Sequence, residues 1–494
     1  MSTLEISQVE KKKERKLAII WAVTFLIVFP LLVILGLYMR LNQGKVVELD
    51  YTKFYAFMTM HGLGMAGVLF SVAFAGLWYL ISTRITRLSL GVGYFVYFTV
   101  LIGFLALAYG TLIGNFAAGW YMLYPLPFKG ASWATWSTQV SAVALILMGI
   151  AWLVGILHLL YALTKRYGGF FNLLGWQYLR KGDHEKLPSV VLIATVALIP
   201  GIFAFLAGAV MLIMYLLQTF EPSLAFNPLL MKNLTFFFGH MLVNVTLYCG
   251  VGWVYALMPE FTKREWKVDK VVVYSWNATF FFIVFAYLHH LYMDFAQPRS
   301  MQYIGQIFSY MSAVPATAVT MFGIIAQVYH SKMKWSIFPL MSLFGMMGWA
   351  IGGFAALVDT TIAINVGLHN TLWVPAHFHT YMLMGVVLFI FGYLFYLFSG
   401  EEGIHLKNVT GKAGFWLFVI GAYGFLLMFY LSGINGVPRR FADYQGIEAG
   451  HVKEMGTQLA RYAAMFIYLI LLGLLVMYWS LFAKLTRRQK ASAW

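Results

Sequence analysis

Twelve apolar runs, each about as long as a bilayer is thick, constrain this chain more than any other feature. A helix needs roughly 20 predominantly apolar residues to cross the hydrocarbon core. With 61% hydrophobic residues and a mean hydropathy of +0.77 over 494 residues, one water-soluble core could not bury the apolar surface. We therefore expect an all-α polytopic membrane protein whose single membrane domain spans 1–494. The runs lie at 17–39, 57–82, 89–117, 135–163, 188–218, 229–258, 271–292, 302–329, 335–357, 374–399, 413–435 and 459–485.

Lysine and arginine residues predict the orientation of the bundle. If the basic N-terminus lies inside, alternation of the runs places most of the 34 Lys and Arg residues in inner loops and tails, which is the positive-inside bias. Both termini are then expected to be cytoplasmic. This topology also accounts for the formal charge of +16, so we expect the lipid bilayer, and no nucleic acid, as a partner.

Cysteine is almost absent. Cys249 is the single cysteine of the chain, so we expect no disulfide framework, no CxxCH motif for covalent haem and no pair of thiolates for a dinuclear copper centre. Metal chemistry in this chain must therefore rest on other side chains.

Histidine is the unusual residue inside the apolar runs. Twelve-helix membrane proteins are commonly transporters, which mark their pathway with buried ionisable groups. These runs contain almost no carboxylate or lysine, whereas six histidines lie within them at matching depth. His158, in the fourth run, has no histidine neighbour, and we expect it only to form a hydrogen bond inside the bundle. The six lie in the outer halves of four runs and are His61, His240, His289, His290, His377 and His379.

Histidine at these positions favours metal binding. Imidazole is costly in a membrane unless its nitrogens have partners. Neutral imidazole is a good ligand of iron and copper, and almost no thiolate or carboxylate is available in the runs. The six side chains therefore predict haem iron or another histidine-bound metal.

The segment HNTLWVPAHFH, at 369–379, predicts two separate sites. Residues two apart on an α-helix point about 200° away from each other. His377 and His379 therefore cannot share one metal and must face opposite sides of their helix. His61 would complete a six-coordinate haem with His379. His289 and His290, adjacent at a helix end, can both turn toward a metal that His240 also reaches.

These motifs resemble those of catalytic subunit I of the haem–copper oxidase superfamily, over essentially the whole chain. HNTLWVPAHFH most resembles the B-type, ba3-like branch. The other segments that carry the resemblance are MHGLGMAG around His61, AAGWYMLYPLP around Trp120 and Tyr124, FFGH ending at His240, YLHHLYMDF around His289 and His290, and GVPRRFADY around Arg439 and Arg440.

The resemblance implies a role for each matching residue. His61 and His379 would bind a low-spin haem, which we expect to be of type b, and His377 would bind a high-spin haem of type b, o or a. His240, His289 and His290 would bind a non-haem metal, with copper favoured and iron the alternative. The surroundings and propionates of the haems would be contacted by Arg439, Arg440, His369, Trp120 and Tyr124. Tyr255 resembles a tyrosine of the B-type proton path, which Thr320 could join.

The chain lacks several residues that the oxygen-reducing members carry, above all the tyrosine of the active site. A- and B-type oxidases carry a tyrosine four residues after the histidine of the sixth helix, and this position holds Asn244. The C-type branch supplies its tyrosine six residues before the histidine pair, where this chain has Ile283. The lysine and glutamate of A-type proton paths are replaced by Val319 and Leu242.

The missing phenol favours nitric oxide reduction over oxygen reduction. Dioxygen cleavage in one step takes four electrons, the last of which comes from the tyrosine. Coupling of two NO molecules to N2O and water takes two electrons and two protons and needs no protein radical. A terminal oxidase with a relocated tyrosine, from among Tyr248, Tyr287 and Tyr292, stays the alternative, and a non-redox transporter is a remote one.

The resemblance also implies partners and a location. No cupredoxin or c-type haem is encoded here, so a second membrane-anchored subunit with a dinuclear copper centre or a c-type haem would receive electrons. Cytochrome c, a similar soluble protein or a quinol would donate them. The expected location is the inner membrane of a bacterial or archaeal cell.

Overall fold

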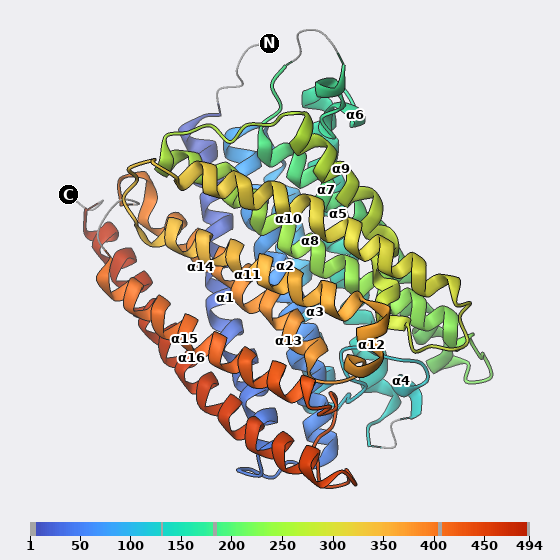
Figure 1. Cartoon of the computed structure of the whole chain (residues 1–494). Coiled ribbons are helices and arrows are strands. Elements are labelled where there is room, and N and C mark those ends of the chain that lie inside the picture. Colours follow the sequence, from blue (N-terminus) through green and yellow to red (C-terminus); the bar gives the residue numbers. More distant parts are fainter. Residues whose placement is uncertain (1–5, 130–131, 181–184, 404–407, 492–494) are drawn as a thin grey trace.

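The chain forms a bundle of long helices (Figure 1). The computed structural model describes residues 6–129, 132–180, 185–403 and 408–491. Twelve helices in these ranges are long and apolar enough to cross a membrane, which confirms the twelve predicted spans. They are α1 (Gln8–Gln43), α2 (Tyr51–Arg84), α3 with η1 (Leu90–Ala108 and Tyr109–Ile113), α5 (Thr135–Tyr167), α7 (Ser189–Phe220), α8 (Pro228–Thr262), α9 with η3 (Lys270–Ala286 and Tyr287–Leu291), α10 (Ser300–Val328), α11 (Ile337–Thr360), α13 with η4 and α14 (Trp373–His379, Thr380–Val386 and Val387–Gly403), α15 (Val409–Ile434) and α16 (Gly450–Ala491).

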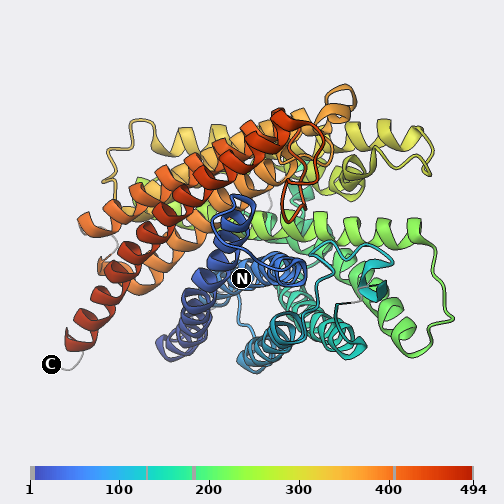
Figure 2. The ribbon, with the colours of Figure 1, turned by 90° about the horizontal axis from the view of Figure 1, so that it is seen from below.

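Four short helices lie in the connections, namely α4 (Leu126–Lys129), α6 (Phe170–Leu173), η2 (Trp176–Leu179) and α12 (Ile362–Leu368). The start of α1 and the end of α16, which adjoin the termini in sequence, lie at one end of the bundle, and α4 and α12 lie at the opposite end (Figure 1). Long helices that follow one another pack side by side, and α1 also packs against α16, the last helix of the chain (Figure 2). Arg461, in the first half of α16, donates to the carbonyl oxygen of Gly44 just after α1.

Polar caps extend the helices beyond the apolar runs. Asp50 caps α2 by accepting a hydrogen bond from the backbone N–H of Lys53 at 2.9 Å, and Asp269 caps α9 in the same way through Val272. A side chain that accepts from the first turn satisfies N–H groups that have no partner within the helix. Both α2 and α9 therefore begin at polar residues before their apolar runs.

Three helices form the centre of the bundle. In the most apolar segments of α2, α8 and the α13–α14 span, 83%, 83% and 89% of the residues are buried. The corresponding share in α10, on the periphery, is 28%. Near the end that carries the termini, Arg84 of α2 contacts Glu260 of α8 at 2.5 Å and donates to the hydroxyl of Tyr396 of α14 at 2.5 Å. Tyr396 also donates to Glu260 at 3.3 Å. This cluster ties together the three central helices.

The span that starts at α13 is not a regular helix. After His379 the chain passes through the π-helical segment η4, which carries an extra residue per turn, before it continues as α14. Short π segments inside α-helices commonly occur at functional sites. A second irregularity is the 3-10 turn η3, which ends the α9 span and contains His289 and His290.

Close packing of α11 against η4 depends on Gly348. A Cβ atom at this position would lie 2.5 Å from the carbonyl oxygen of Met384, which is backbone and cannot rotate away. We expect Gly348→Ala to lower the free energy of unfolding by about 1–3 kcal/mol, as overpacking does elsewhere. Gly353→Ala is the control, because its Cβ would meet only the Tyr381 hydroxyl at 3.5 Å. Helix propensity alone would then stabilise the control by up to about 1 kcal/mol. Denaturant unfolding of both variants in detergent measures the difference, and equal stabilities would contradict it.

Candidate functional site

A cavity of about 430 Å³ lies inside the bundle between the central helices. Its walls are mostly apolar, and the six histidines predicted to lie at matching depth all reach it. All six also lie in the half of the bundle opposite the termini, because α2, α8 and α13 start at that end and η3 finishes there. The predicted site residues that line the cavity are His61, Trp120, His240, Asn244, His289, His290, His377, His379, Arg439 and Arg440.

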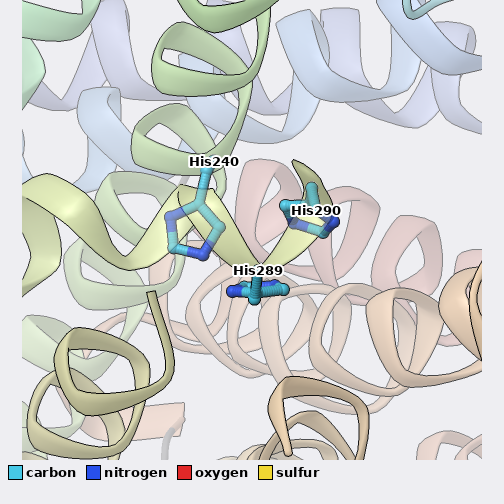
Figure 3. A group of neighbouring side chains, drawn as sticks. All are labelled: His240, His289 and His290. Atoms are coloured by element: carbon cyan, nitrogen blue, oxygen red, sulfur yellow. The ribbon is translucent and has the colours of Figure 1, made fainter. Parts of the chain in front are cut away.

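Three of these histidines form a compact group (Figure 3). His240 comes from α8, and His289 and His290 come from η3. One ring nitrogen from each of the three lies within 4.8 Å of those of the other two, and the ring centres of His289 and His290 are 4.0 Å apart. Imidazole nitrogens at about 2 Å from one metal ion are roughly 3–3.5 Å apart. Small rotations of the rings would therefore bring all three onto one ion.

The hydrogen bonds around His289 suit a metal ligand. Its Nδ1 lies 2.5 Å from the carbonyl oxygen of Ala286 and 3.0 Å from Oγ of Ser309. Donation from Nδ1 to the carbonyl fixes the ring and leaves Nε2 as the acceptor. The Nε2 atom is buried and has no hydrogen-bond partner. Such an atom is costly in an apolar bundle, and a metal ion would give it a partner.

His61 and His379 form the second group. Their ring centres are 6.3 Å apart and their planes differ by 17°. This separation is too large for stacking contact, but it equals about twice the sum of a 2 Å metal–nitrogen bond and the roughly 1.1 Å from that nitrogen to the ring centre. The Nδ1 atoms lie 2.8 Å from the carbonyl oxygen of Leu32 and 2.7 Å from that of Pro375. The two rings therefore fit the axial ligands of one haem iron.

His377 faces a different neighbour from His379, as their spacing predicts. The ring of His379 lies 5.6 and 5.7 Å from those of Phe425 and Phe429 on α15, whereas Nε2 of His377 lies 3.6 Å from Oδ2 of Asp359 on α11. Both ring nitrogens of His377 are buried without a hydrogen-bond partner. His377 could therefore hold a second haem iron from the same cavity.

Asn244 lies beside His240 on α8. Its amide nitrogen donates to the backbone carbonyl of His240 at 2.8 Å and lies 3.3 Å from Nδ1 of the same residue. The amide is thus held against the helix, one turn along from the metal group, and its side chain lines the cavity.

None of the three candidate tyrosines is hydrogen-bonded to the histidine group. The hydroxyl of Tyr287 donates to Asn233 at 2.9 Å, and that of Tyr292 donates to the carbonyl oxygen of Thr360 at 3.1 Å. Tyr248 lines the cavity two turns further along α8 than His240, with its ring edge-on to Trp276. Tyr248 is therefore the one of the three that faces the cavity.

The two adjacent arginines lie at the end of the cavity away from the termini. Arg439 donates from Nε and Nη2 to the side-chain oxygen of Asn370, at 3.2 and 2.9 Å. Nε and Nη2 of Arg440 are buried without a partner, and its guanidinium lies 4.0 Å from the ring centre of Tyr121. Neither arginine forms an ion pair with a described carboxylate.

Burial lowers the pKa of Arg440 to about 10 and, with the charge of Arg440 as the second cause, lowers the pKa of Arg439 as well. Two neighbouring buried cations are costly unless an anion accompanies them. A guanidinium binds a carboxylate through two parallel hydrogen bonds. Arg439 and Arg440 therefore fit haem propionates.

Two other predicted site residues, Trp120 and His369, lie near this end. Trp120 lines the cavity, with the Arg440 guanidinium 5.7 Å from its ring centre. His369 interacts through Nδ1 with Oδ1 of Asn365 at 3.1 Å, and burial, followed by the charges of Arg439, Lys232 and Arg440, lowers its pKa to about 4.

Tyr124, like His369, does not line the cavity. Its ring packs against those of Tyr215 and Phe128, and its hydroxyl accepts a hydrogen bond from Gln218 at 3.3 Å. The contact with Arg440 is made by Tyr121 instead. Both tyrosines belong to the same irregular connection, for which helical spacing gives no prediction of side-chain direction.

Tyr255 and Thr320, the predicted members of a proton path, are hydrogen-bonded to each other. Their hydroxyl oxygens are 2.8 Å apart, and the indole N–H of Trp276 donates to Tyr255 at 3.3 Å. Tyr255 and Thr320 are both buried.

Two buried charged residues near the histidines were not predicted from the sequence. Asp359 lies at the end of α11 and is 1% exposed, and Arg40 lies near the end of α1 with its guanidinium 4.8 Å from the ring centre of Phe429. Arg40 also lines the cavity close to His61 and His379. Each falls just past the end of an apolar run, where a charged residue is normally read as facing water.

The fold and the histidine groups together define a class, the membrane-embedded redox proteins that use haem and copper. The chain belongs to the haem–copper oxidase subunit I family, because the family model described as Cytochrome C and Quinol oxidase polypeptide I matches residues 16–470. That family uses haems and copper, and membership makes this chain an oxidoreductase and a multi-pass membrane protein.

Curated relatives are similar at low identity. The alternative cytochrome c oxidase subunit 1 of Bradyrhizobium diazoefficiens is 26% identical over 441 residues, which are 83% of this chain and 72% of the relative. The cytochrome bo(3) ubiquinol oxidase subunit 1 of Buchnera aphidicola is 26% identical over 358 residues, which are 68% of this chain and 50% of the relative. The subunit 1 of Debaryomyces hansenii cytochrome c oxidase is 23% identical, and this chain spans only 45% of its length.

A solved structure has the same fold. The cryo-EM structure of a heme-copper terminal oxidase dimer matches with a TM-score of 0.78 at 20% identity. The match covers 97% of this chain and 84% of the other chain. The twelve-helix arrangement of subunit I is therefore present in this protein.

Proposed function

We propose that this chain is the catalytic subunit of a respiratory nitric oxide reductase, 2 NO + 2 e⁻ + 2 H⁺ → N2O + H2O. The observation that carries the proposal is Asn244 beside His240, where an oxidase would have a tyrosine. We also propose that the chain belongs to the B-type branch of the family, which its motifs resemble. An asparagine amide can donate and accept hydrogen bonds but cannot supply an electron.

Different histidines bind the three proposed cofactors. His61 and His379 hold a low-spin haem, of type b, and His377 holds a high-spin haem. His240, His289 and His290 hold a non-haem metal, with copper favoured because no carboxylate belongs to the group. When bound and reduced, the high-spin haem and the non-haem metal supply the two electrons that the reaction takes.

The other side chains of the site bind, orient and exclude water. Asn244 keeps a neutral amide beside the ring of His240, within the same cavity as the histidines. Arg439 and Arg440 neutralise and orient haem propionates, and His369 lies near them as a neutral imidazole. The apolar cavity wall keeps out water while it admits a small uncharged gas. Tyr255 and Thr320 are the start of a path that brings protons from the cytoplasmic side.

Oxygen reduction is the second candidate function. Its support is the printed names of the relatives, which are cytochrome c and ubiquinol oxidases, and of the heme-copper terminal oxidase with the same fold. It would need a phenol at the metal group. Tyr248, which faces the cavity two turns from His240, is the residue to which this candidate assigns that role.

The proposed setting follows from the family and from the charge distribution. A second membrane-anchored subunit receives electrons from cytochrome c, a similar protein or a quinol on the outer side. Both termini are cytoplasmic, in the cell membrane of a bacterium or archaeon.

Electrode traces on one purified sample test the proposal. With an artificial reductant, we expect NO consumption to exceed oxygen uptake by about tenfold or more, which corresponds to about 1.4 kcal/mol or more in activation free energy. A reduced-minus-oxidised optical spectrum of the same sample shows whether haem is bound. A spectrum without haem bands would favour a transporter. Rapid oxygen uptake with negligible NO consumption would overturn the proposal in favour of the oxidase.

A further inference from the structure

Asp359 is a buried carboxylate that the proposed reaction does not yet use. It is 1% exposed, near the end of α11, and its Oδ2 lies 3.6 Å from Nε2 of His377. A buried carboxylate is retained in an apolar bundle only when other groups hydrogen-bond to it or pair with it. The ring beside this carboxylate is that of His377, the proposed ligand of the high-spin haem.

The two oxygens of Asp359 have different surroundings. The side-chain amide of Asn365 donates to the backbone carbonyl of Asp359 at 2.6 Å and lies 3.3 Å from Oδ1. Oδ1 of Asn365 is in turn 3.1 Å from Nδ1 of His369. Asn365 on α12 therefore anchors one carboxylate oxygen, and the other oxygen is turned toward His377.

His377 differs from the other proposed ligands in its hydrogen bonds. The Nδ1 atoms of His61, His289 and His379 each lie within 2.8 Å of a backbone carbonyl oxygen. His377 has no such carbonyl, and both of its nitrogens are buried without a partner among the described residues. A metal-bound imidazole almost always donates its second N–H to a carbonyl, a carboxylate or water. Asp359 is the acceptor that His377 otherwise lacks.

We propose that Asp359 is the positioning residue of His377. This inference rests on the proposed role of His377 as a haem ligand and is independent of whether NO or oxygen is reduced. One ring nitrogen binds iron and the other donates to Asp359, which shortens the present 3.6 Å separation to a hydrogen bond of about 2.8 Å. The bond fixes the plane of the ring and makes the imidazole a stronger electron donor, which lowers the reduction potential of that haem.

Asp359→Asn in the full chain with its haems tests the proposal. We expect the iron–histidine stretching band of the reduced high-spin haem to move to lower frequency and its reduction potential to rise, while the low-spin haem is unchanged. Turnover falls by about 10- to 100-fold, as it does when a ligand loses its outer hydrogen-bond partner. Resonance Raman spectroscopy and a spectroelectrochemical titration measure the first two effects.

Glu14→Gln is the matched control. Glu14 is also a buried carboxylate, 5% exposed, and accepts a hydrogen bond from the indole of Trp78 at 3.2 Å, far from the cavity. We expect it to leave the iron–histidine band and both potentials unchanged. The control thus separates loss of a buried carboxylate in general from loss of the one beside His377.

An assembled Asp359→Asn protein with the parental band and potentials would overturn the proposal. If this variant fails to assemble, Asn365→Ala replaces it, because it releases Oδ1 of Asp359 and should move the same band in the same direction by less. An unmoved band in that variant would also overturn the proposal. Neither the iron–histidine band nor the reduction potential is measured with NO. Both therefore test the role of Asp359 even if the protein does not reduce nitric oxide.

Discussion

His290→Ala is expected to remove the non-haem metal and about 10³-fold or more of NO turnover, while both haems stay bound. Two imidazoles cannot reproduce a three-histidine site, and a metal contributes several kcal/mol to stabilising charge in the transition state, at about 1.4 kcal/mol for each factor of ten. The haems should persist because the ring of His290 contacts His289, His240 and Phe236, and none of the proposed haem ligands.

Metal analysis, a haem assay and the NO electrode check this expectation on one preparation. His158→Ala is the control, since His158 is also a histidine of a membrane span. It accepts a hydrogen bond from the backbone N–H of Ser89 at 3.0 Å, stacks near Trp78 and does not line the cavity. The control should keep its metal and its turnover. A His290→Ala protein with full metal content would contradict the three-histidine site.

His61→Ala should lose the low-spin haem and nearly all turnover supported by the natural donor. Without one axial ligand, the pair with a ring separation of 6.3 Å no longer brackets an iron. The loss should exceed the roughly 100-fold that removal of an outer hydrogen-bond partner alone can cause. The pyridine haemochrome assay should show about half of the parental haem per protein.

Added imidazole provides the control for His61→Ala. Imidazole can occupy the space left by the side chain, and we expect it to restore part of the low-spin absorbance. The high-spin haem, on His377, should be unaffected in both samples. Parental haem content and spectrum in His61→Ala would contradict the assignment of this pair.

Hydrophobicity alone was enough to predict the helices. Twelve apolar runs of bilayer length have no other stable solution in lipid, because every backbone polar group must be satisfied within the segment. The ends were less predictable. Tyr51 begins α2 well before the apolar run at 57–82, since Asp50 and the polar first turn lie outside the hydrophobic pattern.

The histidines were predictable for a second reason. Depth in the membrane and the 100° step of a helix fix which side chains can meet, and these two quantities need no tertiary information. His377 and His379 accordingly contact different helices. Two features could not be predicted in this way. The direction of the Tyr124 side chain depends on an irregular loop. The proximity of Asp359 to His377 depends on how α11 packs against α13.

The π segment η4 has a consequence for how this protein can vary. The segment accommodates one extra residue in a wide turn, between α13 with its two histidines and α14, whose Tyr396 is fixed by contacts with α2 and α8. Deleting one residue from 380–386 would therefore restore ordinary α-helical turns and leave the imidazoles close to their present direction. Deleting one residue from the regular helix between Val387 and Tyr396 would instead turn the imidazoles by about 100° relative to Tyr396 and aim both ligands at the wrong neighbours.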